Sequence, residues 1–97
     1  MKQLQILRGK IEEVDSDIIQ LLAERFKTTK QIQNLKIDFG LPLLQKKREK
    51  YLLQKYLKLA KGKKLNLILI RKLFNLIFSY SRKTGIIKRW KKTQKNR

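Results

Sequence analysis

An apolar row with alternating steps of three and four residues runs through the first third of this chain. Its members are Leu4, Leu7, Ile11, Val14, Ile18, Leu21, Ile32 and Leu35. This spacing is typical of one face of an α-helix, and no proline falls within it, so it predicts one long helix over residues 4–35. Because the chain has only 97 residues, the remainder is too short to cover that helix, and we expect a second copy to do so.

Arg25 and Thr28 stand in the register of this row, at positions where an apolar side chain is expected. A guanidinium that is buried without a partner costs several kcal/mol. We therefore expect Arg25 to meet an anion. That anion is either a carboxylate of the protein, such as that of Glu24 or Glu49, or a bound ligand.

The rest of the chain predicts two further helices. After the stop signal DFGLP, where Gly40 can adopt a positive φ and Pro42 suits a first helical turn, a second helix is expected over residues 43–60. Asn66 is a suitable N-cap for a third helix, whose apolar row ends at Ser81. No strand pattern competes, so the predicted fold is all-α with three helices.

Positive charge is concentrated in the second part of the chain. The sequence has 26 Lys and Arg against 7 Asp and Glu, a formal net charge of +19. Residues 1–38 hold seven basic and six acidic side chains, whereas residues 39–97 hold nineteen basic ones and a single acid, Glu49. We expect one domain over residues 1–87 and a basic tail over residues 88–97.

Such a charge attracts anions and gives salt-sensitive affinity for nucleic acid. The basic residues are scattered around the second and third helices, and Trp90 is the only tryptophan that could stack on a base. Nucleic-acid binding is therefore kept as an alternative main role, and otherwise as an incidental property.

The chain contains no histidine and no cysteine. This composition removes disulfides, thiolate nucleophiles, the usual zinc sites and the commonest general acid or base. We expect no metal and no cofactor. No apolar run approaches about 18 residues, so we expect a cytoplasmic protein that does not enter a membrane.

Several cations fall on related helical positions. Arg25 and Lys36 are eleven residues apart, so they point to within about 20° of each other and lie about 16 Å apart along the helix. Arg8 lies about 25 Å from Arg25 along the same axis, too far to reach one small ligand, although it can reach the equivalent site of an antiparallel partner. Arg48, Glu49 and Ser81 add polar groups from the other two helices.

Each of these residues also has an ordinary structural interpretation. A single Arg or Lys on a helix is usually solvated, and Glu49 has many lysines to pair with. Ser81 on an apolar row commonly permits close helix packing. The pattern as a whole carries more weight than any of its members.

Together the motifs resemble the all-helical chorismate mutase family. They are LR at 7–8, LLAER at 21–25, Lys36, the G-x-P turn at 40–42, RE at 48–49 and LFNLIFSYS at 73–81. The resemblance covers about residues 4–85 without a gap. It implies an intertwined homodimer of three-helix chains with two sites, each completed by an arginine of the other chain.

Carried over to this sequence, the resemblance implies a site for the chorismate dianion. Arg25 and Arg48 would grip the carboxylates, assisted by Arg8 of the second chain. Lys36 would donate to the ether oxygen of the breaking bond, and Glu49 would hold the ring hydroxyl. Ser81 falls where a residue helps to bind a carboxylate.

Two positions depart from the family pattern. Gln45 stands where an acidic residue is common in the family, but the resemblance implies that the backbone N–H acts there, so this change should have a mild effect. Gly85 stands where the family carries Gln or Glu as a second donor to the ether oxygen. Loss of one such donor typically costs on the order of 10²–10³ in rate, so we expect a weak mutase unless Thr84 or the tail replaces it. On this reasoning Gly85→Gln should raise turnover.

Two further alternatives stay open within the same fold. Isochorismate pyruvate-lyases use similar cations on a similar dianion, although Glu49, placed for a ring hydroxyl, favours the mutase. A decayed or regulatory homologue would keep the fold and the ligand grip but lose the rate, and Gly85 is the feature that points to it.

Overall fold

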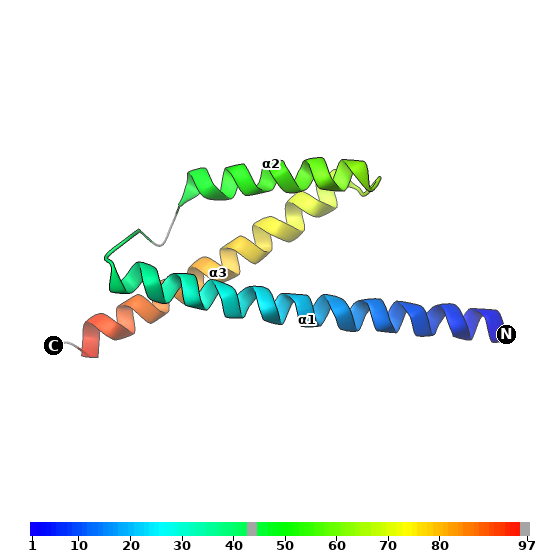
Figure 1. Cartoon of the computed structure of the whole chain (residues 1–97), viewed down its shortest axis with the longest axis horizontal. Coiled ribbons are helices and arrows are strands. Elements are labelled where there is room, and N and C mark those ends of the chain that lie inside the picture. The colour runs from blue at the N-terminus through cyan, green and yellow to red at the C-terminus, as the bar shows by residue number, and fades with distance from the viewer. Residues whose placement is uncertain (43–44, 96–97) are drawn as a thin grey trace. The chain divides into compact units, whose positions relative to one another are not determined.

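The fold is all-α, as predicted. The computed structural model describes residues 1–42 and 45–95, and this part of the chain contains three helices and no strand. They are α1 (Lys2–Asp38), α2 (Lys46–Gly62) and α3 (Leu67–Lys95). Figure 1 shows α1 as one unbroken helix and shows α2 and α3 meeting at the short turn that joins them. The chain divides into two compact units, residues 1–32 and residues 33–97.

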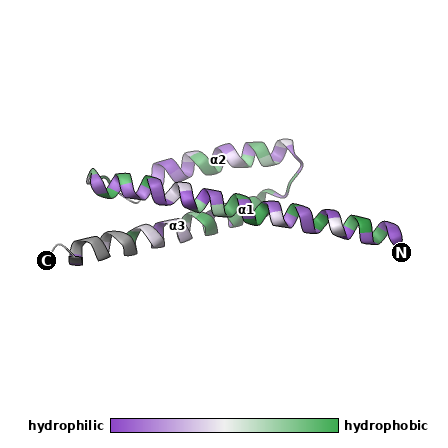
Figure 2. Ribbon diagram, turned by 60° about the horizontal axis from the view of Figure 1, so that its bottom comes forward, coloured by the Kyte–Doolittle hydropathy of each residue, from purple (hydrophilic) through white to green (hydrophobic). Residues whose placement is uncertain are grey.

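The N-terminal unit is a single stretch of helix with an exposed apolar row. The eight members of the row predicted from the sequence, of which Leu35 belongs to the second unit, are each between 44% and 62% exposed in the single chain. Figure 2 shows the hydrophobic positions of α1 alternating with hydrophilic ones along its length. The predicted long amphipathic helix is thus confirmed, and the area of apolar surface that it leaves uncovered is large.

The C-terminal end of α1 is fixed by a Schellman motif centred on Gly40. Gly40 has φ +65°, its N–H donates to the carbonyl of Ile37 over 3.3 Å, and the N–H of Leu41 donates to the carbonyl of Lys36 over 2.7 Å. The predicted stop signal is confirmed. Pro42, however, does not open the next helix, because α2 begins at Lys46; the predicted start at Leu43 lies outside the described residues.

Helices α2 and α3 pack against each other as a hairpin. The side chain of Asn66 accepts a hydrogen bond from the N–H of Leu69 over 3.0 Å, which confirms the predicted N-cap of α3. The ring centroids of Tyr56 and Phe74 lie 4.6 Å apart, and those of Phe74 and Phe78 lie 6.1 Å apart, within the usual range for aromatic pairs. The buried hydrophobic residues of the described chain are Ala60, Ile77 and Phe78.

Helix α3 passes the predicted domain boundary between residues 87 and 88 without a break. Within the described residues, no helix combines the length and the apolar character needed to cross a membrane.

Gly40 and Gly9 offer a matched pair of substitutions with opposite expected effects. Gly40→Ala should lower the free energy of unfolding by about 1–2 kcal/mol, because a side chain is strained at positive φ. Gly9 lies inside α1 with nothing within 4 Å of an added Cβ, so Gly9→Ala should raise stability by about 0.4–1 kcal/mol. Thermal and urea unfolding monitored by circular dichroism would measure both. Equal effects of the two variants would contradict the assignment of Gly40 as the helix cap.

Candidate functional site

Lys36 lies in the last turn of α1, directly before the Gly40 cap. Its side chain is half-buried, and its carbonyl accepts the capping hydrogen bond from Leu41. Gln33 lies three residues earlier and therefore faces the same side of the helix. The cap thus fixes where α1 ends, and Lys36 and Gln33 lie in the last two turns before this end.

Gln33 connects the end of α1 to α3. Its Nε2 donates a hydrogen bond to the backbone carbonyl of Ser81. Gln33 is 6% exposed and Ser81 is 9% exposed, and within the described chain Gln33 Oε1 and Ser81 Oγ are buried without a hydrogen-bond partner. The predicted position of Ser81 on the packed side of α3 is confirmed. Gln33 was not predicted as a site residue, because it lies off the apolar row.

Gly85 lies one turn after Ser81 on α3 and is buried. A Cβ built on Gly85 would lie 2.7 Å from Gln33 Nε2, 2.9 Å from its Cδ and 3.2 Å from its Cγ. These distances are shorter than ordinary van der Waals contact. The space next to Gly85 is therefore filled by the amide of Gln33. The hydroxyl of Thr84, the other residue considered at this place, donates to the carbonyl of Tyr80 over 3.1 Å.

Glu49 lies in the first turn of α2 and forms an ion pair with Arg82 of α3. The side chains of Arg82 and Glu49 are 34% and 25% exposed, so the pair is partly screened by solvent. Arg82 was missed from the sequence. The signal that could have found it is the isolation of Glu49, which is the single acid after residue 38 and so must pair with one of many cations.

An open cleft of about 410 Å³ lies beside this ion pair, between α2 and α3. It is lined by Lys46, Glu49, Lys50, Leu53, Asn75 and Arg82. Three cations, one carboxylate and one amide can bind a small polar anion that also carries a hydroxyl group. Among the predicted site residues, Glu49 is the one that lines this cleft.

Arg48 and Gln45 lie at the N-terminal end of α2. The guanidinium carbon of Arg48 lies 5.5 Å from the centroid of the Tyr51 ring, a cation–π distance, and the side chain is exposed. Gln45 is the N-cap residue of α2, and its carbonyl accepts the N–H of Glu49 over 3.1 Å. Its own side chain makes no capping hydrogen bond.

Arg8 and Arg25 belong to the N-terminal unit. Arg25 is half-buried and Arg8 is exposed. The two threonine hydroxyls next to Arg25 bond to their own helix: Thr28 Oγ1 donates to the carbonyl of Glu24 over 3.0 Å, and Thr29 Oγ1 donates to that of Arg25 over 2.9 Å. The prediction that Arg8 and Arg25 form one binding site with residues of the second unit rests on the sequence alone.

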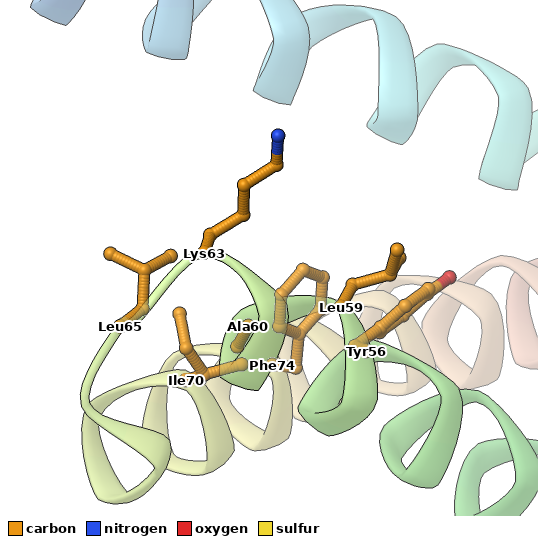
Figure 3. A pocket seen from close by; sticks show the side chains of 7 residues that line it. All are labelled: Tyr56, Leu59, Ala60, Lys63, Leu65, Ile70 and Phe74. Carbon is orange, nitrogen blue, oxygen red and sulfur yellow. The ribbon is translucent and has the colours of Figure 1, made fainter.

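A second pocket, of about 220 Å³, lies near the turn between α2 and α3. Its lining residues are Tyr56, Leu59, Ala60, Lys63, Leu65, Ile70 and Phe74, shown in Figure 3. Lys63 is the one charged side chain of this lining. The apolar walls suit a hydrophobic side chain rather than a dianion.

Comparison with known proteins adds independent information. The sequence profile of the family "chorismate mutase type II" matches residues 7–85. A chorismate mutase of Methanocaldococcus jannaschii is 29% identical over 82 residues, which cover 84% of this chain and 83% of the relative. A bifunctional chorismate mutase/prephenate dehydratase of Buchnera aphidicola is 40% identical over 74 residues, covering 76% of this chain. The corresponding protein of Aquifex aeolicus is 38% identical over 61 residues, covering 63% of this chain.

The two bifunctional relatives are much longer than the matching segment, since this chain spans 19% of the first and 17% of the second. The profile match begins at Leu7 and ends at Gly85, so it includes every site residue predicted from the sequence. Together with the three-helix fold, a match over this length shows that the chain belongs to the chorismate mutase type II family.

Proposed function

We propose that this chain is a chorismate mutase, an enzyme that rearranges chorismate to prephenate. The observation that carries the proposal is the family match over residues 7–85, which includes all eight predicted site residues. We further propose that it acts in the cytoplasm, in the biosynthesis of aromatic amino acids, without a metal or a cofactor.

The reaction suits this composition. It is a unimolecular rearrangement that needs no nucleophile and no proton transfer, so the lack of histidine and cysteine is no obstacle. The enzyme must hold the substrate in a folded conformation and supply positive charge where the ether oxygen becomes negative. Arginines can hold the folded conformation through paired hydrogen bonds to the carboxylates, and a lysine can supply the positive charge at the ether oxygen.

Six of the eight site residues have these roles within one chain. Arg25 and Arg48 bind the carboxylates, and Lys36 donates to the ether oxygen. Glu49 accepts the ring hydroxyl, while Ser81 and the backbone N–H of Gln45 assist the binding of substrate. Arg48 lies exposed at the start of α2, with its guanidinium over Tyr51, so it would have to turn from that ring to bind a carboxylate.

The ion pair between Glu49 and Arg82 supports a positioning role for Arg82. A lone carboxylate next to a dianionic substrate would repel it, and a paired carboxylate does so less. Arg82 holds the side chain of Glu49 while both remain partly open to solvent. In this arrangement Glu49 stays available to accept one hydroxyl hydrogen.

We also propose that the active form is a homodimer in which Arg8 completes the site of the partner chain. The support is the apolar row of α1, whose eight members are 44% to 62% exposed in the single chain. Soluble proteins rarely leave so long an apolar stripe in water. A second copy of the helix would cover the stripe and bring its own Arg8 toward the other site.

The direct test is an assay of purified protein with chorismate. We expect loss of chorismate absorbance and formation of prephenate, identified by its conversion to phenylpyruvate in acid. Arg25→Ala and Lys36→Ala should each lower kcat/KM by about 10²–10³-fold, because each removes a charged group that contacts the substrate or the transition state.

Lys58→Ala is the matched control, since Lys58 is an exposed cation of α2 outside the predicted site. Equal losses in Lys58→Ala and Lys36→Ala would mean that general charge, rather than a site, governs the rate. If the protein formed salicylate from isochorismate and no prephenate from chorismate, the chain would be an isochorismate pyruvate-lyase and not a mutase.

The dimer predicts complementation between two inactive variants. In a mixed dimer of Arg8→Ala and Lys36→Ala chains, one site carries both changes and the other carries neither. After unfolding and refolding of an equal mixture, about a quarter of the wild-type activity should return, because half of the dimers are mixed and one of their two sites is intact. No recovery, with sedimentation showing dimers, would place Arg8 outside the partner's site.

The proposed positioning role of Arg82 predicts a loss of activity that depends on the residue that replaces it. Arg82→Met should lower kcat/KM by about tenfold, because Glu49 loses the group that orients it, and Arg82→Lys should keep most of the activity. Lys83→Met, at the exposed neighbouring position of α3, is the matched control and should leave kcat/KM within about twofold. Full activity of Arg82→Met would show that the ion pair has no part in catalysis.

A further inference from the structure

Gln33 is an unusual residue in its helix. Among the residues of α1, all of which the structure describes, Gln33 alone is buried. A long amphipathic helix normally buries apolar side chains first, because burial of a polar group carries a desolvation cost. A side chain that is buried in spite of this cost calls for a reason beyond packing.

The hydrogen-bonding capacity of Gln33 is only partly used within the described chain. A primary amide nitrogen carries two hydrogens, and Gln33 Nε2 donates one of them to the carbonyl of Ser81. Gln33 Oε1 and Ser81 Oγ are both buried without a partner among the described residues. Because unpaired buried polar atoms are rare, two of them on residues joined by one hydrogen bond make this a candidate place for a polar ligand.

The absence of a side chain at Gly85 leaves room for the Gln33 amide. A Cβ added to Gly85 would lie 2.7 Å from Gln33 Nε2 and 2.9 Å from its Cδ. A side chain at position 85 would therefore compete with that of Gln33 for the same space. The family resemblance implies Gln or Glu at the position of Gly85, as a donor to the ether oxygen. In this chain the side chain in that space comes from α1, one turn before Lys36.

We propose that Gln33 is a catalytic residue: its second Nε2 hydrogen is donated to the ether oxygen of the substrate, beside the ammonium of Lys36. The proposal rests on the proposed mutase function and deepens it. The donor expected at position 85 is therefore supplied from another helix rather than lost. Gly85 is then the condition that lets Gln33 enter the site.

This inference reverses the expectation drawn from the sequence for Gly85→Gln. A side chain at position 85 would displace the amide that already occupies its space, so Gly85→Gln alone should not raise turnover. When Gln33 is shortened as well, the space becomes free. Gln33→Ala/Gly85→Gln should then carry one amide in the site, supplied from α3.

The test compares four variants with the wild-type protein in the chorismate assay. Gln33→Met keeps the volume of the side chain but removes the donor, and it should lower kcat by about 10²–10³-fold while KM stays within about threefold. Gln33→Ala should lower kcat by a similar factor. Gly85→Gln should show a kcat no higher than wild type, and Gln33→Ala/Gly85→Gln should recover to within about tenfold of wild type.

Asn34→Ala is the matched control, because Asn34 carries the same amide at the neighbouring exposed position of α1. Its kcat should equal that of the wild type. Melting temperatures of all variants, measured by circular dichroism, separate a lost donor from a lost fold: Gln33→Met should melt within a few degrees of wild type although its rate is low.

Two results would overturn the assignment of Gln33. One is a Gln33→Met variant whose kcat stays within about twofold of wild type. The other is a Gly85→Gln variant that turns over faster than wild type, since this would show that the site lacked a donor. Failure of the proposed function looks different: the wild-type protein itself would form no prephenate, and no comparison among the variants would arise.

Discussion

The burial of the apolar row on α1 is the requirement on which the rest of this molecule depends. Within the described part of the chain, Ala60, Ile77 and Phe78 are the buried hydrophobic residues, whereas the eight apolar residues of the row are 44% to 62% exposed. Hydrophobic stabilisation grows with the apolar area removed from water, so a single copy leaves part of the stabilisation available from this row unused. In the proposed homodimer a second copy would supply the missing cover, and the polar interruptions of the row at Arg25 and Thr28 would fall where the two chains meet.

The chemistry of the site follows from charge rather than from reactive groups. A chain without histidine or cysteine can still catalyse a rearrangement in which negative charge grows on one oxygen. The cleft between α2 and α3 already presents Lys46, Lys50 and Arg82 around one paired carboxylate, so its charges are arranged before a ligand arrives. The excess of basic residues after residue 38 also raises the local concentration of a dianion.

Features set by local sequence were predictable, and features set by tertiary contact were not. The single long helix α1, the cap at Gly40 and the N-cap at Asn66 depend on residues within one or two turns, and the structure has all three, although α1 (Lys2–Asp38) extends a few residues beyond both ends of the predicted 4–35. Gln33 and Ser81 are 48 residues apart, and Glu49 and Arg82 are 33 apart. No periodicity connects such pairs, and neither Gln33 nor Arg82 lies on the rows that led to the other site residues. The prediction from Pro42 was wrong, because a residue that suits a first helical turn does not by itself fix where a helix begins.

Position 85 shows why a site cannot be read from one helix alone. Along α3, a glycine where the family resemblance implies Gln or Glu predicts a missing donor and hence a weak or decayed enzyme. In three dimensions the same glycine has the Gln33 amide within 2.7 Å of where its side chain would begin. What the transition state requires is a donor at a point in space, and any helix that borders this point can provide it. A glycine at a functional position therefore signifies a lost group only after the neighbouring helices have been searched for the side chain that fills its space.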